Sequence, residues 1–175
     1  MENSLTRYAR HIEQLFRDLD TRQHQYYADI AQGIKGVEVV RLSDVLSKDE
    51  VKELKKYVRP KRRMCYLNAY KVCEFFSFCD TSHDVVYCEG YKSVCNVPID
   101  HAFNKIDGKF VDITMEFALN DETFTDDEYA VIGEFGFGLV EDAALSTGFY
   151  GEVYRYVWNK LTDTTYKRVE VVSEK

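Results

Sequence analysis

The chain has 175 residues, of which 45% are hydrophobic and 14% are aromatic, and only two are prolines. This length and composition predict one compact, ordered domain over residues 1–175 and argue against disorder over most of it. A formal net charge of −7 argues against general affinity for nucleic acids or for anionic membranes.

Two features of the chain bear on its compartment. No run of residues is apolar enough to cross a bilayer, and the first residues lack the basic start and apolar stretch of a secretory signal, so we expect a cytoplasmic protein. The five cysteines, an odd number, then predict reduced thiols and not a disulfide framework. They are Cys65, Cys73, Cys79, Cys88 and Cys95.

The first predicted element is an amphipathic helix over residues 4–32, which continues or restarts before Gly33 and Gly36 break the pattern. We expect this N-terminal helical lobe, residues 1–36, to pack on the rest of the domain, residues 37–175. A partner-binding or dimerising arm is the alternative. The apolar face of the helix comprises Leu5, Tyr8, Ala9, Ile12, Leu15, Phe16 and Leu19.

A short β-branched strand is predicted over residues 37–42, followed by a helix that starts at the capping box of Ser47 and Glu50 and stops before Pro60. A basic segment follows, and its last two members, Arg62 and Arg63, stand directly before Cys65. Positive charge at a helix start is typical of a site for an anionic or phosphate-bearing substrate, whereas a merely solvated charged face is the other interpretation. The basic residues are Lys52, Lys55, Lys56, Arg59, Lys61, Arg62 and Arg63.

Cys65 stands where the next helix is expected to begin. Small or apolar residues recur after it with the spacing of one buried helical face, at Ala69, Val72, Cys73 and Phe76. No Ser, Thr, Asp or Asn occupies residues 62–64, so the first backbone N–H groups lack a side-chain cap. Free N–H groups, the helix dipole and the two arginines favour a thiolate at Cys65, which is the chemistry of a nucleophile.

A β-hairpin is predicted around Asp107-Gly108, the favoured pair for a two-residue type I′ turn. This turn places Asn104 opposite Val111, and it puts His101 and Asp112 on one face as diagonal neighbours about 7–8 Å apart at the backbone. A carboxylate and an imidazole at that separation can form a hydrogen bond. We therefore expect His101 and Asp112 to interact.

These motifs together resemble a known family. A cysteine that opens a helix, a strand that ends in Gly-Tyr (residues 85–91), His-Ala-aromatic, a glycine turn and Val-Asp-x-Thr resemble the transglutaminase-like branch of the papain-like cysteine enzymes, over about a third of the chain. The resemblance implies that Cys65 is the nucleophile, His101 the general base and Asp112 the residue that orients the histidine. The chain departs from the family at Phe103, where tryptophan is usual, and at residues 63–64, where the family often has a Gly-x step.

The resemblance also implies an α+β fold, with the nucleophile helix packed on a small, mainly antiparallel sheet. It implies covalent acyl transfer through a thioester, with a protein, a peptide-like molecule or a small amide as substrate. Water as acceptor would give a protease, amidase or deamidase, and an amine would give a transferase. Nothing in the sequence calls for a metal or an organic cofactor, and it does not indicate an oligomeric state.

Two alternatives belong to other classes of protein. In the first, the papain-like fold is a binding or inhibitory module with an inactive triad. In the second, the cysteines bind zinc with His83 or His101 as a further ligand, although structural zinc sites usually contain C-x-x-C pairs and this chain has none.

The remaining elements are less distinctive. Residues 116–128 are acidic and predict a solvated loop or rim, and the alternating glycines of residues 133–138 predict a turn or a mobile flap. Helices are expected over residues 139–146 and 150–161, and a last strand over residues 165–172.

Overall fold

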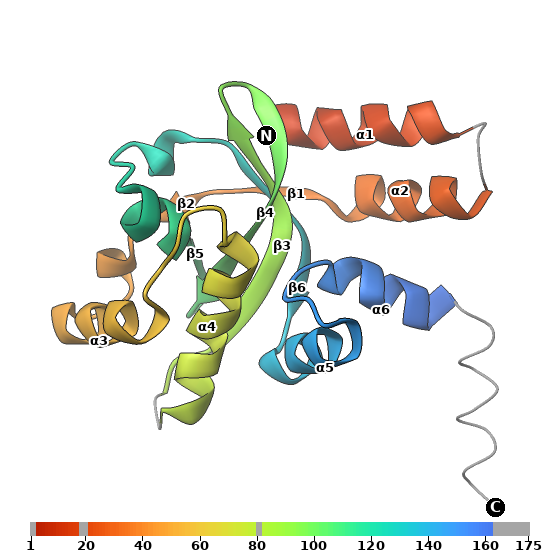
Figure 1. The fold of residues 1–175 in the computed structure, drawn as a ribbon. Helices are drawn as coiled ribbons and strands as arrows, with labels where there is room; N and C mark the ends of the chain where they lie inside the picture. The colour runs from red at the N-terminus through yellow and green to blue at the C-terminus, as the bar shows by residue number, and fades with distance from the viewer. Residues whose placement is uncertain (1–2, 18–20, 80–81, 163–175) are drawn as a thin grey trace, which may run out of the picture.

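The computed structural model describes residues 3–17, 21–79 and 82–162 (Figure 1). Its fold is α+β and contains a six-stranded, mostly antiparallel sheet in the order β1-β6-β3-β4-β5-β2. In this sheet β2 pairs with β5 in parallel, and the other neighbouring strands are antiparallel. The strands are β1 Lys35–Val37, β2 Val39–Val40, β3 Val85–Val94, β4 Val97–Ile106, β5 Lys109–Val111 and β6 Tyr129–Phe135.

The sheet curls strongly. β1 and β2 occupy its opposite edges, yet only Glu38 separates them in the chain, so the two edges lie close together. Val39 from one edge and Val131 from beside the other accordingly share a buried cluster with Phe103 of the central strand β4. The single strand expected over residues 37–42 is therefore wrong in detail, since the segment forms two short strands on different neighbours.

Two tight turns set the register of the central strands. Cys95 and Asn96 join β3 to β4 with φ of 49° and 63°, and Asp107 and Gly108 join β4 to β5 with φ of 49° and 82°. Positive φ at both central residues is the geometry of a type I′ turn, which matches the twist of the flanking strands. The predicted pairing of Asn104 with Val111 is confirmed.

Helix α4, Cys65–Phe78, packs against β3 and β4 (Figure 1). Helix α3, Lys48–Val58, packs against α4. The predicted inward stripe of α4 is confirmed, because Ala69, Val72, Cys73 and Phe76 are buried. The start and the end of α3 are confirmed as well: Ser47 and Glu50 form the capping box, and the helix stops two residues before Pro60.

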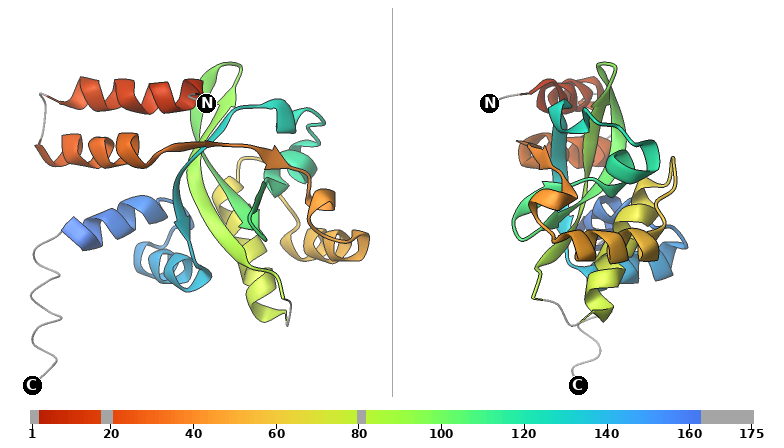
Figure 2. Two further views of the ribbon diagram at one scale, coloured as in Figure 1. Left: turned by 180° about the vertical axis from the view of Figure 1, so that it is seen from behind. Right: turned by 90° about the vertical axis from the view of Figure 1, so that its left-hand side faces the viewer.

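The N-terminal lobe consists of two helices, α1 Ser4–Phe16 and α2 Thr21–Gly33, which lie side by side and project from the sheet (Figures 1 and 2). The part of the lobe nearest the sheet packs on the domain as expected. Leu5, Ala9 and Ile30 form a buried cluster with Ala130 of β6. Leu15, near the far end of α1, is 55% exposed.

Helices α5, Phe137–Thr147, and α6, Val153–Thr162, follow β6 and confirm the two helices expected near the end of the chain. Residues 133–138 are neither a turn nor a flap, because Gly133–Phe135 completes β6 and Gly136 leads into α5. The Phe135 ring covers the bare Cα of Gly133, where a Cβ atom would come within 2.4 Å of it, so this glycine is needed for packing inside a strand.

The acidic segment is also more ordered than expected. Its first residues belong to a π-helical turn, Thr114–Leu119, and its Phe124 is fully buried. Glu116 accepts a hydrogen bond from the backbone N–H of Leu42 at 2.9 Å, so this carboxylate is structural. The strand expected over residues 165–172 lies outside the described residues. Within the described part of the chain, none of the helices has the length and apolarity needed to span a bilayer.

Candidate active site

His101 and Asp112 form a buried pair, with His101 Nε2 2.6 Å from Asp112 Oδ2. The two residues are 4% and 0% exposed. His101 lies on β4 and Asp112 directly follows β5, so the turn at Asp107-Gly108 brings them together. The predicted contact is confirmed. Because Nε2 faces the carboxylate, Nδ1 is the ring nitrogen left for another partner.

Asp112 is surrounded by hydrogen-bond donors. Its Oδ1 accepts from the backbone N–H groups of Thr114 and Met115 at 3.0 and 3.1 Å, and its Oδ2 accepts from the Tyr129 hydroxyl at 3.0 Å. Burial alone would raise the pKa of this carboxyl group, but the charge and hydrogen bond of His101, together with these donors, hold the pKa below its ordinary value. Asp112 is thus a buried carboxylate held in one orientation.

The His101 ring is fixed from its sides as well. The Phe103 ring lies nearly parallel to it at 6.3 Å, and the Tyr129 ring lies 6.2 Å away. Burial disfavours the charged imidazolium, but Asp112, with a smaller contribution from Cys65, outweighs burial and raises the pKa of His101 above its ordinary value. The protonated form of the ring is therefore more stable than in an ordinary histidine.

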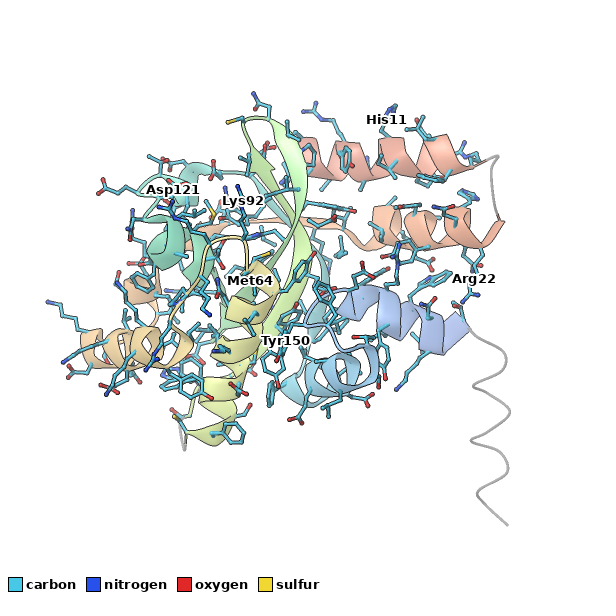
Figure 3. The ribbon with its side chains drawn as sticks, viewed as in Figure 1. His11, Arg22, Met64, Lys92, Asp121 and Tyr150 are labelled. Atoms are coloured by element: carbon cyan, nitrogen blue, oxygen red, sulfur yellow. The ribbon has the colours of Figure 1, made fainter. Side chains whose placement is uncertain are left out.

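Cys65 is the first residue of α4, and Figure 3 shows its predecessor Met64 at the start of that helix. As the sequence predicts, no side chain caps this helix start. Burial raises the pKa of the Cys65 thiol, but a hydrogen bond and the charge of His101, with the backbone N–H groups of Ala102 and Tyr66, lower the pKa below its ordinary value overall. Cys65, His101 and Asp112 thus form one row.

Asn68 ties the approach to Cys65 to the segment that follows Asp112. Its side chain accepts a hydrogen bond from Lys61 N at 3.1 Å and donates to Lys61 O at 2.8 Å and to Thr114 Oγ1 at 3.0 Å. Asn68 is 1% exposed. One side chain therefore fixes the loop before the nucleophile relative to the carboxylate of the row.

Asn104 fastens α4 to β4 one helical turn further along. Its Nδ2 donates to Ala69 O at 3.0 Å and to Cys73 Sγ at 3.2 Å. Cys73 is a buried core thiol, and burial raises its pKa to about 12, so it does not compete with Cys65 as a nucleophile.

The two arginines before Cys65 are exposed. Arg62 donates from Nε to the carbonyl oxygen of Ala118 at 3.2 Å, and Arg63 has φ of 60°. Neither lines the cavity of about 140 Å³ next to Tyr66. The structure thus leaves them at the surface before the nucleophile.

The cysteines lie on separate elements: two on α4, one just after it, one on β3 and one in the β3–β4 turn. His83 contacts Asp107 and Glu50 instead of a thiol. Among residues 3–17, 21–79 and 82–162, no group of three or more Cys, His, Asp or Glu side chains is arranged to hold a metal ion.

Two side chains of the site were missed by the sequence analysis. Asn68 carries a recognisable signal, since it is a polar residue on the buried face of a helix and buried polar groups need partners. Tyr129 carries none, because it reaches Asp112 only through the pairing of β6 with β3, which no local pattern reveals.

No protein-family model, no curated protein and no solved structure matches the chain.

Proposed function

We propose that the protein is a cysteine-dependent acyl-transfer enzyme with a papain-like catalytic core of the transglutaminase-like kind. The observation that carries the proposal is the row formed by Cys65, His101 and Asp112, in which the imidazole is hydrogen-bonded to the carboxylate and interacts with the thiol. A nucleophile, a base and a residue that orients the base are the three parts that nucleophilic catalysis needs.

The pKa directions support an ion pair between a Cys65 thiolate and a His101 imidazolium. A lowered thiol pKa beside a raised imidazole pKa favours the proton on the ring and the thiolate form of the sulfur. Asp112 stays ionised and balances the charge of the ring. The resting site is then ready for attack without prior deprotonation.

In the proposed reaction the Cys65 sulfur attacks the carbonyl carbon of an amide, and the carbonyl oxygen becomes an oxyanion. Free N–H groups at the uncapped start of α4, beginning with that of Cys65, are suitable donors to this oxygen. As the carbon–nitrogen bond breaks, the departing amine takes the proton from His101 and a thioester remains. His101 then removes a proton from water or from an acceptor amine, which releases a carboxylic acid or a new amide and restores the thiolate.

The fold supports the same proposal. A helix that begins with the nucleophile packs on antiparallel strands that carry the histidine, and the carboxylate follows the next strand. A protein, a peptide-like molecule or a small amide is the proposed substrate, and a cytoplasmic, reducing compartment would keep the thiol active.

Arg62 and Arg63 are proposed to bind an anionic part of the substrate, because they are exposed directly before Cys65. Replacement of both by glutamine should weaken turnover of acidic substrates more than that of neutral ones. Equal losses for both kinds of substrate would remove this role.

The proposed function is tested with a p-nitrophenyl ester as an activated acyl donor, followed by mass spectrometry of the acid-quenched protein. We expect an acyl adduct on Cys65 that decays in water and turns over, faster than any adduct on Cys79 or Cys95. Cys65→Ala should lose turnover and keep its melting temperature. Equal turnover by wild type and Cys65→Ala would reject the proposal of a cysteine-dependent enzyme. A binding or inhibitory module would then be the remaining interpretation.

A further inference from the structure

A cavity next to Tyr66 lies among α2, β3, β4, β6, α6 and the start of α4, and its lining includes chain neighbours of the proposed catalytic residues. Tyr66, which follows Cys65, lines it, and so does Asp100, which precedes His101. Gly90 lines it as well and pairs with His101 in the sheet. A group bound in this cavity would therefore lie near the start of α4 and the His101 segment of β4, where the proposed reaction takes place.

The lining of the cavity combines aromatic rings with carboxylates. Three acidic side chains line it, Glu89, Asp100 and Glu152, against one basic side chain, Arg155. π-Faces and carboxylates together are the surroundings that organic cations prefer, because both carry negative potential. The aromatic residues are Tyr26, Tyr27, Tyr66, Tyr91 and Tyr154.

The three carboxylates differ in what they already bind. Glu89 is buried and accepts from the backbone N–H groups of Val153 and Tyr154, both at 2.9 Å, and from the Tyr87 hydroxyl at 3.2 Å. It serves the start of α6 and shapes the cavity wall. It is not free for a ligand.

Asp100 differs from Glu89 in being available. Glu152 pairs with Arg155 at 3.2 Å, whereas within the described part of the chain Asp100 makes no side-chain hydrogen bond or ion pair. Asp100 is exposed to solvent, so a ligand can reach it.

The chain itself shows that a guanidinium group fits these surroundings. The Arg155 guanidinium lies 5.5 Å from the centroid of the Tyr26 ring while it pairs with Glu152. A second cation would find Asp100 and further tyrosine rings in the same lining. An anionic group would instead face the negative charges that Arg155 does not balance.

We propose that this cavity binds the guanidinium or ammonium group of a basic residue in the acyl donor, with Asp100 as its ion-pair partner. This inference rests on the proposed function and names its substrate class: peptides with Arg or Lys at the acyl position. The cation is a recognition group here, and no bond to it forms or breaks. Arg62 and Arg63 lie outside the cavity, so their proposed binding of an anionic part of the substrate is independent of the cation site.

The test compares two peptidyl chloromethyl ketones that differ only in arginine against citrulline, its neutral isostere. In both, the Cys65 sulfur displaces chloride and a carbon–sulfur bond forms, and mass spectrometry follows the rate. Each rate is divided by that of iodoacetamide, which lacks a side chain. We expect the arginine probe to react about tenfold faster, equivalent to about 1.4 kcal/mol of binding.

Asp100→Asn should bring this ratio close to one, while Asp126→Asn, which changes an exposed carboxylate outside the cavity, should preserve it. Asp100 is exposed, so the variant should remain folded, and a thermal melt checks this. A ratio near one in the wild type, with iodoacetamide still labelling Cys65, would overturn the cavity proposal and leave acyl transfer standing.

A binding measurement separates the two proposals completely. Calorimetry with Cys65→Ala protein compares N-acetyl-arginine amide with N-acetyl-citrulline amide, so no reaction is needed. Tighter binding of the arginine compound, lost on adding Asp100→Asn, would support the cation site even if Cys65 proved unreactive. Equal binding of the two compounds would overturn it.

Discussion

The Tyr129 hydroxyl donates a hydrogen bond, at 3.0 Å, to the same Asp112 oxygen that holds His101. Tyr129 is fully buried, and its ring also lies beside Lys92, whose Nζ is 5.2 Å from the ring centroid and pairs with Asp127 (Figure 3 labels Lys92). The row that starts at Cys65 therefore continues through Asp112 into the interior of the curled sheet. Tyr129 is a positioning residue in this arrangement.

Tyr129→Phe should keep the ring and remove only the donor. Hydrogen bonds to charged groups contribute about 1.5–3 kcal/mol, so the free energy of unfolding should fall by that amount in urea denaturation. As a control, Tyr156→Phe removes a hydroxyl that donates to the exposed carboxylate of Asp142 and should change stability little. Similar small losses in both variants would show that Tyr129 does not hold Asp112.

Asp112→Asn should change the reactivity of Cys65 indirectly, through His101. The charge of Asp112 is the main reason why the pKa of His101 is raised despite burial, so its loss lowers that pKa and returns the proton to the thiol. Each pKa unit gained by the thiol reduces the thiolate tenfold. We expect iodoacetamide labelling of Cys65 at pH 6 to slow by about tenfold or more.

The matched control for that experiment is Asp126→Asn, which neutralises an exposed carboxylate of the acidic segment. It should leave the labelling rate of Cys65 unchanged. If Asp112→Asn also leaves the rate unchanged, Asp112 does not govern the histidine.

Asn68→Ala should destabilise the approach to the nucleophile. The substitution removes the amide that binds both backbone groups of Lys61 and the buried Thr114 hydroxyl, and a buried polar group without a partner costs about 1–3 kcal/mol. A loss of about 2 kcal/mol or more is expected in urea denaturation. Asn159→Ala, at an exposed amide that pairs with Arg22, should cost far less. Equal costs would contradict the role given to Asn68.

His83 should make stability depend on pH. Its ring bridges Asp107, at 2.6 Å, and Glu50, at 3.0 Å, and thereby joins the β4–β5 turn to α3. The Asp107 hydrogen bond, then that of Glu50, raises the pKa of His83. The stabilisation is thus full below the ordinary histidine pKa and is lost as pH rises through the raised value.

The carboxylates set the lower limit of the same window. Hydrogen bonds from Ser47 and then His83 lower the pKa of Glu50 to about 2, and the hydrogen bond from His83 also lowers the pKa of Asp107. Their contribution is present above the ordinary carboxyl pKa values and disappears as pH falls through the lowered ones. The stability difference between wild type and His83→Gln should therefore be largest near pH 5–6. A difference that does not vary with pH would exclude this bridge.

The sequence predicts those parts of the site that depend on local rules. Asp107-Gly108 specifies a two-residue turn, the turn specifies the register of Asn104 with Val111, and the register puts His101 beside Asp112. The start of α4 at Cys65 is likewise local, because it follows from the spacing of the buried face.

What the sequence does not predict depends on contacts between distant segments. The β-branched residues after Val37 indicate strand, but only the curl of the sheet decides that β1 and β2 pair at different edges. The glycines around Gly133 locally predict a turn, whereas the need of Gly133 for space under Phe135 is a packing requirement that no local pattern reveals. The cavity next to Tyr66 is lined by residues from six elements, α2, α4, β3, β4, β6 and α6, so no local pattern groups its carboxylates.

The most direct test of the central claim is the pH profile of iodoacetamide labelling at each cysteine of the wild-type protein, resolved by mass spectrometry. If Cys65, His101 and Asp112 act as one row, Cys65 reacts at pH 6 faster than the other four thiols, and His101→Ala abolishes this advantage. A Cys65 profile that rises only near pH 8–9, like that of an ordinary thiol, would contradict the account.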